Sequence, residues 1–163
     1  FCLSRGLGDV YKRQGEAIMV DVGDKIITSR VAKAMARVSM QRQTLDLIAS
    51  DQMKKGDVLG CARIAGIMAG KKTAGLIPLC HMLPLESIKV DLVLNYEKLS
   101  VDIVATASCS YKTGVEMEAL TAALISALTV YDMCKAVDKE MIISDAALLE
   151  KSGGKSEIHR EML

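Results

Sequence analysis

The feature that most constrains the fold is a pair of alternating segments joined by a short polar stretch. In the first segment apolar residues stand at every second position, namely Ile88, Val90, Leu92 and Leu94. The second segment repeats this alternation with Val101, Ile103, Ala105 and Ala107. A period of two is typical of a half-buried strand. Because residues 95–98 are few and polar, the two segments predict an antiparallel hairpin.

Three stretches around the hairpin have helical features. Residues 44–53 indicate a short helix, and residues 56–71 place apolar side chains on one helical face. Residues 113–137 are rich in Ala and Leu all round, which predicts a long helix buried on more than one side. Thr113 and Glu116 have the spacing of a capping box at its start.

Two further segments complete the expected architecture. Residues 30–40 give mixed strand and helix signals, and residues 141–149 indicate a last strand. Helices interleaved with a hairpin and a returning strand predict an α+β fold, in which helices cover one face of an antiparallel sheet.

The length of 163 residues fits one domain. We expect this domain to span residues 15–156, with a flexible tail over 157–163. Residues 1–14 show no sustained period, so we expect a non-native or disordered extension there.

Charge and composition exclude several classes of partner. A net charge of +1 and an aromatic content of 3% disfavour nucleic-acid binding. The apolar stretch 119–131 is shorter than the ~20 residues of a membrane span, so no membrane contact is expected. The five cysteines are odd in number and scattered, which favours reduced thiols in the cytoplasm. No set of three or four zinc ligands is evident, so we expect no metal.

Several polar residues have both a structural and a functional interpretation. His81 follows Cys80 in a loop between two prolines, and it is either bonded to a backbone carbonyl or used as an acid, base or ligand. Asp132 and Lys135 form either a solvated ion pair or a functional pair at the end of a buried helix. Glu118 either complements the helix dipole or serves a site.

The glycine-rich segment 151–156 carries Lys151 and Lys155. It is not a nucleoside-triphosphate loop, because Leu149 stands where that motif requires glycine. The two lysines either close over an anion or belong to a solvated tail.

Seven runs of residues, in order along 19–156, resemble the cyclic pyranopterin monophosphate synthases of molybdenum cofactor biosynthesis. The runs are MVDV at 19–22, KGDV at 55–58, ARIAGI at 62–67, LIPLCH at 76–81, TGVEMEALTA at 113–122, YDMCKAVD at 131–138 and KSGGKS at 151–156.

The resemblance implies a ferredoxin-like α+β subunit in a hexamer built from dimers, with active sites at subunit contacts. It also implies a phosphorus–oxygen lyase that converts 3',8-cyclo-7,8-dihydroguanosine 5'-triphosphate to cyclic pyranopterin monophosphate and releases pyrophosphate. No redox step is required, so no cofactor is expected. The competing interpretation is a non-catalytic module that binds a nucleotide or pterin.

The resemblance also assigns roles to residues of this chain. The expected proton-transfer groups are Asp132, Lys55 and Lys135, with His81 as a second acid-base group. The expected substrate-binding residues are Leu79, Cys80, His81, Met117, Glu118, Arg30, Lys71, Lys151 and Lys155, of which the basic ones hold the triphosphate. Such lysines stabilise charge on departing phosphate oxygens, and a desolvated lysine beside another cation has a lowered pKa that helps it donate protons.

Overall fold

The computed structural model describes residues 15 and 17–162, and the extension expected over 1–14 lies outside them. In chain order the elements are β1 (Thr28–Ser39), α2 (Arg42–Ala49), α3 (Val58–Gly70), α4 (Thr73–Leu76), β2 (Ser87–Asn95), β3 (Ser100–Tyr111), α5 (Glu116–Cys134), β4 (Ile142–Ser152) and β5 (Ile158–His159).

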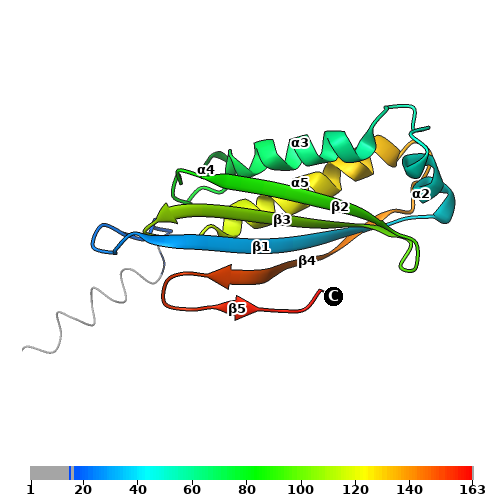
Figure 1. The fold of residues 1–163 in the computed structure, drawn as a ribbon. Coiled ribbons are helices and arrows are strands. Elements are labelled where there is room, and N and C mark those ends of the chain that lie inside the picture. Colours follow the sequence, from blue (N-terminus) through cyan, green and yellow to red (C-terminus); the bar gives the residue numbers. More distant parts are fainter. Residues whose placement is uncertain (1–14, 16, 163) are drawn as a thin grey trace, which may run out of the picture.

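The strands form one five-stranded sheet in the order β2-β3-β1-β4-β5, and all neighbouring strands are antiparallel. β2 and β3 are the hairpin predicted from the alternation, with a register that runs from Ser87 opposite Ser108 to Asn95 opposite Ser100. The long helices α3 and α5 lie together on one side of this sheet (Figure 1). The α+β prediction is therefore confirmed.

Small side chains let α5 approach the sheet closely. Fully buried alanines of β1 and β3 and alanines of α5 belong to one core. α3 and α5 also pack closely, because a side chain at Gly66 would place its Cβ 2.0 Å from the hydroxyl of Ser126. That hydroxyl donates a hydrogen bond to the carbonyl of Ala62 at 3.0 Å, which ties the two helices together.

The start of α5 differs from the prediction. Val115 is the N-cap residue, and no side chain forms a capping hydrogen bond there. The expected capping box is thus wrong, because the Glu116 carboxylate pairs with Lys151 Nζ at 2.5 Å. α5 ends at Cys134, earlier than the expected residue 137.

α5 has the length and hydropathy of a membrane-spanning helix, although the sequence analysis expected no such span. Half of this apolar segment is buried inside the fold, and a core helix has the same composition. Packing against β1, β3 and α3 accounts for its apolar character here.

The C-terminal region extends the sheet. β4 runs to Ser152, beyond the expected end at residue 149. Part of the segment expected as a flexible tail forms β5, which pairs with Glu150 and Lys151 of β4. The Arg160 N–H also donates to the carbonyl of Leu149 at 2.8 Å. These bonds place the glycine turn between β4 and β5 beside the start of β1.

Candidate active site

Three of the four residues expected to transfer protons lie together at the C-terminal end of α5. Lys55 Nζ is 2.6 Å from one carboxylate oxygen of Asp132, and Lys135 Nζ is 2.7 Å from the other. Lys55 comes from the loop before α3, where Gly56 has a φ of 88°. Lys55 Nζ also donates to the main-chain carbonyl of Asp132 at 3.1 Å. We call these three residues the acid-base cluster.

The acid-base cluster is open to solvent and strongly polarised. The side chains of Lys55, Asp132 and Lys135 are 48%, 51% and 56% exposed. Hydrogen bonds from Lys135 and Lys55 lower the pKa of Asp132 to about 2, so its carboxylate is ionised at neutral pH. The same contact with Asp132 raises the pKa of Lys135. The lowered pKa described for a desolvated lysine beside another cation therefore does not apply to Lys135, whose partner is an ionised carboxylate.

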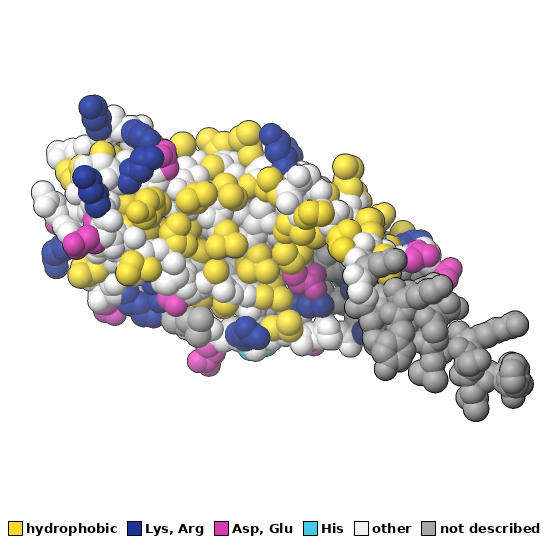
Figure 2. Space-filling model, turned by 180° about the vertical axis from the view of Figure 1, so that it is seen from behind, with side chains coloured by type: hydrophobic (Ala, Val, Ile, Leu, Met, Phe, Trp, Pro, Cys, Tyr) yellow, Lys and Arg dark blue, Asp and Glu magenta, His cyan; other side chains and the backbone are white. Residues whose placement is uncertain are grey.

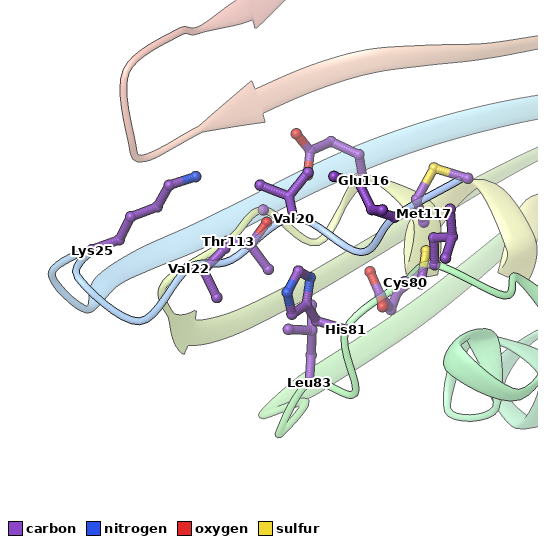
Figure 3. Close-up of a pocket in the computed structure, with 13 residues that line it drawn as sticks. Val20, Val22, Lys25, Cys80, His81, Leu83, Thr113, Glu116 and Met117 are labelled. Atoms are coloured by element: carbon purple, nitrogen blue, oxygen red, sulfur yellow. The ribbon is translucent and has the colours of Figure 1, made fainter. Parts of the chain in front are cut away.

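Five of the expected substrate-binding residues gather at the opposite end of α5. Leu79, Cys80, His81, Met117 and Glu118 line a cavity of about 460 Å³ (Figure 3). Met117 and Glu118 occupy the first turn of α5, and the other three lie on the loop after α4. We call this the ring cavity. The structure thus separates His81 from the acid-base cluster with which it was grouped.

A buried carboxyl group distinguishes the ring cavity from the acid-base cluster. Glu118 is only 4% exposed, and burial, with the nearby charge of Glu116, raises the pKa of its carboxyl. Burial also raises the pKa of the Cys80 thiol, and the charge of Glu118 adds to this effect. Cys80 is therefore a neutral thiol at pH 7, and Glu118 is the buried one of the two carboxyl groups that line this cavity, the other being Glu116.

A second cavity, of about 610 Å³, adjoins the first and shares Lys25, Thr113, Gly114 and Glu116 with it. Its basic residues are Lys25, Arg30, Lys112, Lys151 and Lys155. Among the described polar side chains, the hydroxyl of Thr28 in this cavity is the buried group that has no hydrogen-bond partner. We call this the basic cavity, and its charge suits a polyphosphate.

Arg30 holds the glycine turn beside the basic cavity. Its Nη1 donates to the carbonyl of Gly153 at 2.9 Å, while Nε and Nη2 donate to the carbonyls of Tyr111 and Lys112. Gly153 and Gly154 have φ values of 84° and 92°, and a Cβ on Gly154 would lie 1.9 Å from Arg30 Nη1. The guanidinium therefore positions the turn that separates Lys151 from Lys155.

Lys71 lies apart from the other expected phosphate-binding residues. It lines a cavity of about 420 Å³ with Ile67, Glu86 and Ile88, between α3 and the start of β2. Leu83 lines both this cavity and the ring cavity, so the two are neighbours.

Sequence reasoning missed several residues of the two cavities. Glu116 was expected only to cap α5, although it lines both cavities. Lys25 and Lys112 were not singled out; the position of Lys112 just before the start of α5 is the signal that indicates a role beside Met117 and Glu118. Within residues 15 and 17–162, no group of three His, Cys, Asp or Glu is arranged to hold a metal ion.

Comparison with known proteins identifies relatives along nearly the whole chain. The Clostridium perfringens (strain SM101 / Type A) protein named cyclic pyranopterin monophosphate synthase is 52% identical over 146 residues, which cover 90% of this chain and 92% of that protein. A Herpetosiphon aurantiacus protein of the same name is 54% identical over 86% of each chain.

The Arabidopsis thaliana protein named cyclic pyranopterin monophosphate synthase, mitochondrial, is 54% identical over 87% of this chain and 53% of its own length. Residues 19–154 match the MoaC family, a range that includes the acid-base cluster and most of both cavities. This chain belongs to the MoaC family.

Proposed function

We propose that the chain is a cyclic pyranopterin monophosphate synthase of molybdenum cofactor biosynthesis. It converts 3',8-cyclo-7,8-dihydroguanosine 5'-triphosphate to cyclic pyranopterin monophosphate and pyrophosphate. Relatives that carry this enzyme name are 52% and 54% identical to the chain across most of its length. The observation that carries the proposal is the acid-base cluster, in which an ionised carboxylate lies between two ammonium groups.

The acid-base cluster suits a rearrangement that moves several protons. At neutral pH the Asp132 carboxylate is ionised, because its pKa is about 2, so it carries no proton and is available as an acceptor. Lys135, whose pKa is raised, supplies one to an oxygen or nitrogen that gains electrons when a ring opens. Lys55 contacts the same carboxylate and completes the relay.

The basic cavity suits the triphosphate. A cyclic phosphate forms when a sugar oxygen attacks the α-phosphorus, the bond to the bridging oxygen breaks, and pyrophosphate leaves. Negative charge grows on the departing oxygens, and preorganised lysines stabilise it. Lys151 and Lys155 occupy the two sides of the glycine turn at this cavity, and Lys112 lines the same cavity from the loop before α5.

The ring cavity suits the guanine-derived end of the substrate. Glu118 is buried at the start of α5 and presents a carboxyl group to the cavity. An ionised carboxylate accepts two N–H groups from the guanine edge, and such paired bonds are strong in a buried site. His81 lines the same cavity and acts there as an acid-base group close to the rings.

We further propose that each active site is shared between two subunits of a hexamer built from dimers. Glu118 and Asp132 are fourteen positions apart on α5, which places them roughly 21 Å apart along its axis. One small substrate does not reach both within one chain. Residue 125 lies midway, so a two-fold axis near it brings the Glu118 end of one subunit to the Asp132 end of the other.

The exposed side of the helical layer supports this arrangement. Ile64 and Met68 of α3 are 61% and 51% exposed, and Leu124 and Leu128 of α5 are 39% and 54% exposed. The view from behind shows apolar side chains across the middle of the molecule, with basic groups gathered mainly at the end on the left (Figure 2). A subunit contact along α5 buries these side chains, which favours association.

The cytoplasm is the compartment that we propose. Cys61, Cys80, Cys109 and Cys134 are free thiols in the structure, in keeping with a reducing environment.

Pyrophosphate release tests the proposed function. Purified protein is mixed with the cyclised dihydroguanosine triphosphate, and pyrophosphate is measured against consumed substrate. The enzyme releases one pyrophosphate per substrate and forms the cyclic phosphate product. A binding module instead retains the substrate unchanged, so binding without pyrophosphate would overturn the proposal.

A further inference from the structure

The segment before β1 forms one wall of the ring cavity. Ile18, Val20 and Val22 line this cavity, whereas Met19 and Asp21 between them do not. Alternate residues of an extended chain point to opposite sides, which explains the pattern. We call residues 18–22 the strap. It crosses the cavity opposite the loop that carries His81, as Figure 3 shows for Val20 and Val22.

The strap is anchored by hydrogen bonds at its C-terminal end. Lys112 Nζ donates to the carbonyl of Gly23 at 2.5 Å, and the Lys25 N–H donates to the carbonyl of Val22 at 3.1 Å. Asp21 accepts a hydrogen bond from the Gly23 N–H at 2.8 Å, which tightens this turn. Lys112 directly precedes Thr113 and Gly114, which also line the ring cavity. The hydrogen bonds at this end of the strap therefore fix the positions of Val20 and Val22.

The apolar side chains of the strap are left partly uncovered. Ile18 is 53% exposed and Val20 is 62% exposed, although both face the cavity. Burial of such side chains is favourable, so a ligand with an apolar face gains affinity by lying against them. Leu83 and Met117 supply apolar surface elsewhere in the cavity, and Glu118 supplies a polar group.

This distribution fits a flat bicyclic ring with polar edges and apolar faces. We propose that the strap covers one face of the substrate's ring system, and that Val20 and Val22 are substrate-contact residues that select a bicyclic ring. The inference rests on the proposed function and deepens it, because it assigns the ring and the phosphates to different walls. The strap contacts the ring system of the substrate, while the basic cavity binds its phosphates.

The test compares two probes and two variants of the full chain. Guanosine triphosphate carries a flat bicyclic base and three phosphates, whereas inorganic tripolyphosphate carries the phosphates alone. Val20→Ser removes apolar surface from the cavity side of the strap. Met19→Ser makes a matched change on the opposite side, where the side chain is 50% exposed. Calorimetric titration measures each Kd.

We expect Val20→Ser to weaken guanosine triphosphate binding about tenfold, the effect of losing one buried valine. Tripolyphosphate binding by this variant should stay within twofold of the wild type, and Met19→Ser should change neither Kd. In turnover assays Val20→Ser should raise KM by a similar factor and leave kcat within about twofold.

Three results would overturn the strap proposal. The first is that the wild type does not bind guanosine triphosphate. The second is that Val20→Ser loses affinity equally for both probes. The third is that Val20→Ser and Met19→Ser lose the same affinity. Failure of the proposed function is read separately, from wild-type protein that releases no pyrophosphate. The two titrations still decide the role of the strap in that case.

Discussion

The carboxyl groups at the two ends of α5 have pKa values that are shifted in opposite directions. At the C-terminal end Asp132 is half exposed, and two ammonium groups lower its pKa to about 2. At the N-terminal end Glu118 is buried, and desolvation raises its pKa. The first carboxylate is kept ionised by direct contacts, whereas the second is destabilised by loss of water. One helix thus carries a solvent-exposed, ionised carboxylate at one end and a buried carboxyl group at the other.

The same contrast supports the proposal that each active site is shared between two subunits. The acid-base cluster is too open to exclude water, and the ring cavity contains neither Asp132 nor Lys55. Electrostatic stabilisation of a transition state is strongest where water is excluded. In the proposed dimer, a second subunit laid along α5 would enclose both ends at once.

The largest expected effect comes from the acid-base cluster. Asp132→Asn removes the proton acceptor and Lys135→Ala removes a donor, so each should lower kcat by at least ~100-fold. Lys139→Ala, a change at a lysine that shares no ion pair with Asp132, serves as the control and should keep full activity. Circular dichroism checks that all three variants are folded. Near-normal turnover in Asp132→Asn and Lys135→Ala would reduce the cluster to a surface ion pair.

The next effect tests whether the two ends of α5 meet across a dimer. Glu118→Ala and Asp132→Asn are each expected to be inactive. When they are coexpressed, a mixed dimer collects both lesions in one site and leaves the other intact. Random pairing makes half of the dimers mixed, so activity should return to about a quarter of the wild type.

Two affinity tags isolate the mixed dimers, and pyrophosphate release measures their turnover. Each single variant must first be shown to fold and assemble. Isolated mixed dimers that remain inactive would place each active site within one subunit.

The two carboxylates should also respond to pH with opposite signs. Asp132 has a lowered pKa in the folded state, so its ion pairs stabilise the fold above pH ~4, and this is lost as pH falls toward 2. Asp132→Asn should therefore lower Tm at pH 7, with the difference shrinking between pH 4 and 2. Glu118 has a raised pKa, so its ionisation opposes folding at pH 7.

Glu118→Gln should accordingly raise Tm at pH 7, and the gain should fade as acid protonates Glu118 in the wild type. Calorimetric melting of both variants from pH 7 to pH 2 provides the comparison. The same sign of Tm change for both variants at pH 7 would contradict the electrostatic difference between the two ends.

The local sequence pattern was sufficient to predict the hairpin of β2 and β3 but not to predict strand β1. β2 is an edge strand with one exposed face, so its alternation is visible in the sequence. β1 lies between β3 and β4, and Ala34, Met35 and Ala36 are all fully buried. Burial of consecutive residues removes the period of two, which is why residues 30–40 gave mixed signals.

The candidate site shows the same limit of local reasoning. Asp132 and Lys135 are three positions apart on a helix, and their spacing alone indicates a contact. Lys55 is 77 positions from Asp132, so only the family resemblance joined it to the pair. Glu116 was taken for a helix cap because its true partner, Lys151, is distant in sequence and is brought near by the sheet.

The smallest expected effect concerns the ion pair between Glu116 and Lys151. Both side chains are 22% exposed and line the basic cavity, so the carboxylate competes with a bound polyphosphate for the ammonium group. Glu116→Gln removes this competition, and its Kd for inorganic tripolyphosphate should fall by up to about fivefold, the upper range for such an ion pair. Glu150→Gln breaks a similar pair with Lys33, at 3.2 Å, and that pair lies outside the basic cavity. Its Kd should be unchanged, and weaker binding by Glu116→Gln alone would show instead that the carboxylate holds Lys151 in its binding position.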